Sequence, residues 1–149
     1  MKNSLLLRLL LFCTVFSYPL FGQIIPKNLP AQRTTLPVVI DGKLTDLAWK
    51  DAAKADDYTE FRPVIGRKEE QGNHTETFLM YDNEGIYFGG TCFERSLDSI
   101  SKELKGRDGF GMNDYIGIIF DTYNDKLNGF EYFVTPLGEQ WDAKMTSNT

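Results

Sequence analysis

Three aromatic side chains, Trp49, Trp141 and Phe110, are the residues of this sequence best suited to stack against a flat ligand. A buried tryptophan removes about 200 Å² from water, worth roughly 5 kcal/mol, whereas stacking on a ligand contributes about 1–3 kcal/mol. Trp49 lies in a short apolar run with Leu47 and Ala48. We therefore predict that Trp49 packs in the core and does not bind a ligand.

Trp141 and Phe110 are the candidate ligand-contacting residues. Trp141 alternates with polar residues and shares a strand face with Ala143 and Met145, a pattern that favours the core. It is nevertheless the best candidate for an aromatic platform. Phe110 is flanked by glycines, and an aromatic residue on such a loop either recognises a ligand or folds back onto the core.

The acidic residues offer a second type of chemistry, calcium binding by carboxylate oxygens. The candidates are Asp108, Asp114, Asp121, Asp125 and Asp142. The spacing Asp121-x-Tyr123-x-Asp125 departs from the calcium-loop pattern at its third position, so we predict that these acids form turns or face solvent. A structural calcium ion is the alternative, and no other cofactor is expected.

Catalysis is not indicated by the residue types. His74 is the single histidine and Cys92 is the only cysteine beyond the N-terminal segment, so a zinc site lacks ligands. The sequence has no Gly-x-Ser-x-Gly motif for a serine nucleophile, and no pair of acids lies in an identifiable cleft. We predict a protein that is not an enzyme, with Cys92 as a small buried apolar residue.

The N-terminal segment, residues 1–22, has Lys2 and Arg8, no acid and an apolar stretch, which is typical of a secretory signal peptide. The stretch is shorter than the ~20 residues that span a bilayer, so no membrane span is expected after cleavage. Removing the segment changes the formal charge from −5 to −7, and so acidic a chain is repelled by nucleic acid. We expect an exported protein that is periplasmic, outer-membrane-associated or extracellular.

Local patterns predict the elements that must position these residues. Residues 23–36 read as an exposed leader, Pro37–Ile40 as a short strand, and Asp41-Gly42 as a turn. Thr45 is expected to cap a short helix, with Asp46 in its first turn. Structural roles are assigned to Asp41, Gly42, Asp46 and Trp49.

The remaining sequence reads as hairpins and short turns. The predicted strands are an irregular one at Tyr58–Val64, a hairpin of Thr77–Tyr81 with Ile86–Phe93, a covered central strand at Asp114–Asp121, and strands at Gly129–Thr135 and Gln140–Met145. Leu97–Leu104 is expected as a helical turn. This spacing predicts one all-β domain over residues 37–149, an antiparallel β-sandwich with short helical turns. A sandwich with so few strands would have open sheet edges. We therefore expect this sandwich to be incomplete and to be the front part of a longer protein.

Four motifs occur in the order of a known family. They are IDGKLTDLAW (Ile40–Trp49), LMYDNEGIYFGG (Leu79–Gly90), RDGFGMNDYIGIIFDTYND (Arg107–Asp125) and FVTPLGEQWDA (Phe133–Ala143). Over Pro37–Met145 the chain resembles the family 9 carbohydrate-binding module. It is most similar to the N-terminal module of large bacterial envelope proteins whose C-terminal region resembles an outer-membrane barrel.

The resemblance implies a β-sandwich that binds carbohydrate and continues with further strands. The family's first sugar-clamping tryptophan falls at Gly111, beside Phe110, and the second has no counterpart in this sequence. Two polar sugar ligands of the family fall at Gly117 and Phe133, so the chain departs from that clamp.

These observations leave three hypotheses for function. The first is a non-catalytic module that binds a polysaccharide or oligosaccharide through Phe110 and Trp141, with a link to polysaccharide breakdown. The second is a structural or interaction module of the same fold that has lost sugar binding and packs on its own C-terminal region or a neighbour. The third is a fragment of a glycoside hydrolase whose catalytic part lies outside this sequence.

Overall fold

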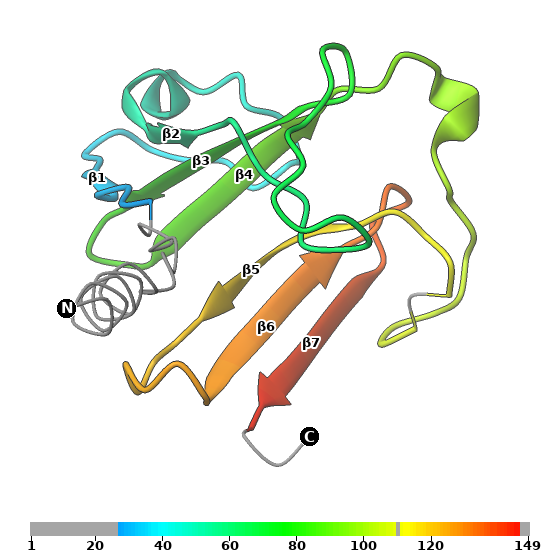
Figure 1. Ribbon diagram of the computed structural model, residues 1–149. Helices are drawn as coiled ribbons and strands as arrows, with labels where there is room; N and C mark the ends of the chain where they lie inside the picture. Colours follow the sequence, from blue (N-terminus) through cyan, green and yellow to red (C-terminus); the bar gives the residue numbers. More distant parts are fainter. Residues whose placement is uncertain (1–26, 110, 147–149) are drawn as a thin grey trace, which may run out of the picture.

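The computed structural model describes residues 27–109 and 111–146, so the expected signal peptide lies outside the described residues. The described chain forms two β-sheets, of four and three strands, with only two short 3-10 turns (Figure 1). The predicted all-β, sandwich-like fold is confirmed. No helix among the described residues is long and apolar enough to cross a membrane.

The first sheet is built on a long hairpin. Strand β3 (Thr75–Tyr81) pairs antiparallel with β4 (Ile86–Cys92) along its whole length. The turn between them is held by Asp82, whose carboxylate accepts backbone N–H groups at 2.7 and 3.0 Å. On its other side β3 pairs antiparallel with β2 (Ala53–Ala55) and parallel with β1 (Gln32–Arg33).

The second sheet is a meander in the order β5–β6–β7. Its strands are β5 (Ile116–Phe120), β6 (Gly129–Val134) and β7 (Gln140–Met145), all antiparallel. The chain reaches β5 from β4 through the turn η2 (Leu97–Ser99) and a long loop. Strand β7 has the bounds predicted from its clean alternation of apolar and polar residues.

The first sheet is covered differently on its two faces, because side chains alternate along each strand. On one face, Met80 packs with Ala48 and Trp49 of the turn η1 (Leu47–Asp51) to form the buried core. On the other face, a Cβ added at Gly90 would lie 2.5 Å from Cδ1 of Ile116 in β5. The first sheet therefore lies between the Trp49 cluster and the second sheet.

Several predicted elements of the N-terminal part are wrong. The predicted exposed leader, residues 23–36, is described from residue 27 onward, and there Gln32–Arg33 pairs with β3 and Thr34 beside it is buried. Pro37–Ile40 is not a strand, and Asp46, not Thr45, occupies the N-cap position of η1, where its side chain makes no capping hydrogen bond. The Asp46 carboxylate instead accepts the N–H of Val39 at 2.9 Å, which holds the entering chain.

Four further sequence predictions, on two elements, one strand position and one residue's burial, are also wrong. Tyr58–Val64 forms only an isolated bridge at Thr59, and the helical turn at Leu97–Leu104 is limited to η2. Strand β5 lies at an edge of its sheet, not at its centre, and Ile119 on it is 50% exposed. Cys92 is exposed, not buried, at the end of β4.

Candidate functional site

A row of three aromatic rings crosses the second sheet. The Phe133 ring of β6 lies 5.4 Å, centroid to centroid, from the Trp141 ring of β7 at an angle of 51°. On the opposite side, the Tyr115 ring, just before β5, meets Phe133 edge-on at 5.3 Å. Phe133 and Trp141 are paired in the strand register, which places both side chains on one face.

Gly117 makes room for this row. It is the register partner of Phe133 on β5, and a Cβ added there would collide with the Phe133 ring and the Tyr132 carbonyl oxygen. The Phe133 ring therefore lies over the glycine, against the backbone of β5. Gly117 and Phe133 are thus direct neighbours across β5 and β6, and together they contribute to an aromatic surface.

The row lies on the face of the second sheet that points away from the first sheet. Ile116 faces β4, and Gly117 is the next residue along the strand, so Gly117 and its partner Phe133 lie on the opposite face. Tyr115 is 56% exposed. We call this surface, formed by Tyr115, Gly117, Phe133, Trp141 and Glu131, the aromatic face.

Glu131 supplies the polar group of the aromatic face. It lies two residues before Phe133, between Ile119 of β5 and Ala143 of β7 in the register. Its carboxylate makes no hydrogen bond or ion pair within residues 27–109 and 111–146. An acceptor beside stacked rings can bind ligand hydroxyl groups, since specific sites combine apolar surface with a few polar groups.

The loop that carries Phe110 is fixed to β7. Glu139 accepts the backbone N–H of Lys105 at 2.9 Å and also that of Gly106. Asp108 donates its N–H to the carbonyl of Gln140 at 3.1 Å. Arg107 forms an ion pair with Asp142. Phe110 itself lies outside the described residues, but both of its flanking segments belong to this loop.

The residues given structural roles lie far from the aromatic face. Trp49 is 6% exposed in the core cluster, which is where its sequence setting predicts it. Gly89 of β4 lets it approach, because a Cβ there would be 3.1 Å from the Trp49 ring. Asp41 accepts the N–H of Lys43 at 2.9 Å, and Gly42 has a φ of +79°, a turn conformation that suits glycine.

The acidic candidates for calcium binding are engaged in local contacts. Asp121 accepts the N–H groups of Asp125 and Lys126 at 3.1 and 2.8 Å, which closes the β5–β6 loop. Asn128, through its side chain and its N–H, lowers the pKa of Asp125. Asp114 accepts the N–H of Ser101. The described part of the chain has no group of three potential metal ligands.

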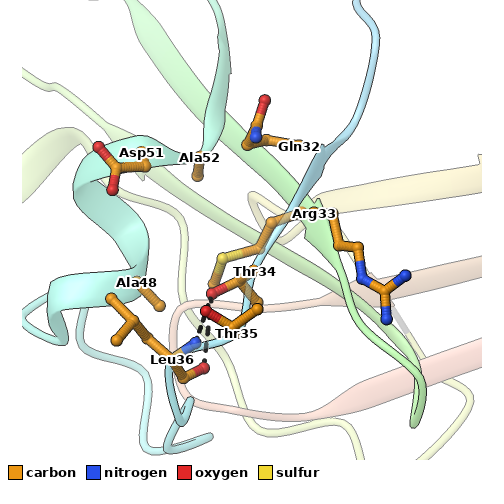
Figure 2. A pocket seen from close by; sticks show the side chains of 9 residues that line it. Gln32, Arg33, Thr34, Thr35, Leu36, Ala48, Asp51 and Ala52 are labelled. Carbon is orange, nitrogen blue, oxygen red and sulfur yellow. Dashed lines mark hydrogen bonds between the residues drawn. The ribbon is translucent and has the colours of Figure 1, made fainter.

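Two hollows of the described structure lie beside the sheets. One, of about 730 Å³, lies between the sheets, and its lining combines apolar residues such as Phe88 and Ile118 with Gly117, Phe133 and Trp141 of the second sheet. The other, of about 450 Å³, lies between β1 and η1 (Figure 2). Figure 2 shows Arg33 extending away from Thr34 and Thr35, and its guanidinium donates to Asn83 at 2.6 Å. The lining of this second hollow contains no aromatic residue.

Comparisons with protein families, curated proteins and solved structures found no match for this chain. The site therefore rests on its own geometry. Of the residues predicted to contact a ligand, Trp141 lies on the aromatic face. Tyr115, Phe133 and Glu131 were not predicted, and only the register of β5, β6 and β7 brings them together.

Proposed function

We propose that the chain is a non-catalytic carbohydrate-binding module whose sugar-binding surface is the aromatic face. The observation that carries this proposal is the row of Tyr115, Phe133 and Trp141 laid over Gly117. Aromatic rings offer the apolar C–H face of a sugar a flat surface, and they lose little side-chain entropy on binding. Glu131 would accept hydrogen bonds from sugar hydroxyl groups.

The charge of the protein favours neutral glycans. The formal net charge of the whole chain is −5, and the aromatic face carries a carboxylate without an ion-pair partner among the described residues. A uronic-acid or sulfated polysaccharide would be repelled from it. The exported setting and the attachment to a larger envelope protein belong to the same proposal, supported by the N-terminal sequence and the family resemblance.

Affinity electrophoresis through gels that contain plant or microbial polysaccharides tests this function. We expect at least one neutral polysaccharide to retard the purified protein and the variant Trp141→Ala to migrate as in an empty gel. The matched control is Phe61→Ala, which removes an aromatic ring that is 73% exposed outside the two sheets. Retardation that is equal in the wild type and Trp141→Ala would place binding elsewhere.

A further inference from the structure

The three rings of the aromatic face do not share a plane. The Trp141 ring is tilted by 51° from the Phe133 ring, and the Tyr115 ring stands at 86° to the same Phe133 ring. Because these two angles differ, the Tyr115 and Trp141 rings are not parallel to each other either. A flat ligand surface can therefore stack against only one of the three rings at a time.

The spacing of the rings corresponds to consecutive units of a sugar chain. Phe133 lies in the middle of the row, with its ring centroid 5.3 Å from that of Tyr115 and 5.4 Å from that of Trp141. Each step is close to the advance of one sugar unit along an extended β-1,4-linked chain. Since an aromatic ring stacks on the apolar face of one sugar, the row corresponds to three consecutive units.

The tilt of the rings determines which form of such a chain fits. Sugar units that stack on two or three of these rings must be rotated relative to one another. In an ordered fibre, contacts with neighbouring chains hold each chain as a flat ribbon, whereas a separated chain rotates about its glycosidic bonds. Phe133 packs over Gly117 and contacts both other rings, so the tilt is fixed before a ligand arrives. A site preorganised in this way favours the twisted chain.

Glu131 favours the same form of the chain. It lies two residues before Phe133 on β6, and therefore on the same face of the sheet. In an ordered fibre, the hydroxyl groups of neighbouring chains bond to one another, so few of them can donate to this carboxylate. A separated chain offers its hydroxyl groups, so the polar group and the rings select the same ligand.

We propose that the ligand of the aromatic face is a single twisted chain of a neutral β-1,4-linked glycan, bound over three consecutive sugar units. This inference rests on the carbohydrate-binding function proposed above. The flat surface of an ordered fibre of the same glycan meets only one ring, so it binds weakly. The protein is thereby directed to soluble or disordered polysaccharide.

Binding to crystalline and swollen forms of one glycan tests this selectivity. Cellulose, chitin and mannan are each prepared in both forms, so that within a pair only the order of the chains differs. Depletion isotherms with the purified protein give dissociation constants, which do not depend on how much surface each form exposes. For at least one glycan we expect the swollen form to bind at least about tenfold more tightly, because stacking on two rings is lost at a flat surface.

Oligosaccharides of the same three glycans, from one to five sugar units long, test the length of the site by calorimetry. For the wild type we expect the affinity to rise up to three units and then to level off. Tyr115→Ala removes the ring at one end of the row, so its affinity should level off at two units. Tyr115→Phe keeps the ring and is the matched control, which should behave as the wild type does. Circular dichroism establishes that both variants are folded.

The outcomes separate this inference from the proposed function. Equal dissociation constants for the two forms, an affinity that levels off at one unit, or a Tyr115→Ala variant that still levels off at three units would overturn the inference and leave sugar binding in place. Binding to none of the three glycans, with retardation by a different neutral polysaccharide, would do the same. Binding to no polysaccharide in either assay would overturn both.

Discussion

The two tryptophans occupy opposite kinds of environment. Trp49 is enclosed by η1 and the first sheet, where it joins Ala48 and Met80 in the buried core. Trp141 lies on the three-stranded second sheet, half-buried, beside a tyrosine that is 56% exposed. One ring is covered by its own chain, and the other lies in an aromatic row on the face that points away from the first sheet.

In both regions a glycine leaves the space in which an aromatic ring packs against a strand. Gly89 lets the Trp49 ring pack against β4 from the covered side of the first sheet. Gly117 lets the Phe133 ring lie on the backbone of β5 on the open side of the second sheet. The first glycine allows packing of the buried core, and the second shapes the aromatic face. Substitutions in the Trp49 cluster should therefore lower stability, whereas substitutions on the aromatic face should also weaken polysaccharide binding.

The largest expected effect is that of Trp49→Ala. Removing a buried tryptophan costs about 3–5 kcal/mol, which is comparable with the whole stability of a small domain, about 5–15 kcal/mol. We expect the variant to lose its cooperative thermal transition, measured by circular dichroism. An unchanged transition would remove Trp49 from the core and end the contrast between the two regions.

Gly117→Ala should have the next largest effect. The added methyl group meets the Phe133 ring and the Tyr132 carbonyl, and overpacking of this kind costs about 1–3 kcal/mol. We expect a lower midpoint in urea denaturation and weaker retardation in polysaccharide gels. Gly85→Ala is the matched control, because a Cβ there meets nothing within 4 Å. Equal midpoints for the two variants would contradict the close approach of Phe133 to β5.

Trp141→Ala should separate binding from stability. Because its ring is only half-buried, we expect a stability loss of about 1 kcal/mol, as is usual for partly exposed sites, and full loss of polysaccharide retardation. Urea denaturation and affinity electrophoresis of the same preparation measure the two effects. A loss of stability as large as that of Trp49→Ala would show that both tryptophans are core residues.

The smallest expected effect is the loss of the stability contributed by the Asp82 carboxylate at acid pH. The backbone N–H of Glu84, with help from Gly85 and Tyr87, holds the pKa of Asp82 below its ordinary value of 3.8. A carboxyl group whose pKa is lower in the folded than in the unfolded state stabilises the protein at pH values above its unfolded-state pKa. This contribution is lost as the pH falls through the folded-state pKa. Melting temperatures should therefore decline below about pH 3.8. The decline should be shallower in Asp82→Asn; an identical decline would contradict this role of Asp82.

The parts of the fold that sequence reasoning predicted are those fixed by neighbouring residues. The turn at Asp82 and the alternation of β7 specify the first hairpin and the last strand locally. Strand β1 could not be predicted, because Gln32 pairs with Met80, which is distant in the sequence. Its pairing depends on the first hairpin already being in place.

The candidate site was predicted only in part for the same reason. Trp141 stands out by residue type, whereas Phe133 and Gly117 were marked only by the family resemblance, as positions that lack its polar ligands. Their roles follow from a register that pairs them directly across β5 and β6. The edge position of β5 likewise follows from strand order, which its apolar sequence does not reveal.

The most direct test of the central claim, that the aromatic face binds sugar and the Trp49 cluster does not, is a pair of single-tryptophan fluorescence titrations. Trp49→Phe leaves Trp141 as the only tryptophan, and Trp141→Phe leaves Trp49. Both variants are titrated with the polysaccharide that retards the wild type, or with the neutral panel if none does. We predict a saturable change in emission for Trp49→Phe and no change for Trp141→Phe. A saturable change in the second variant alone, or in neither, would contradict the account.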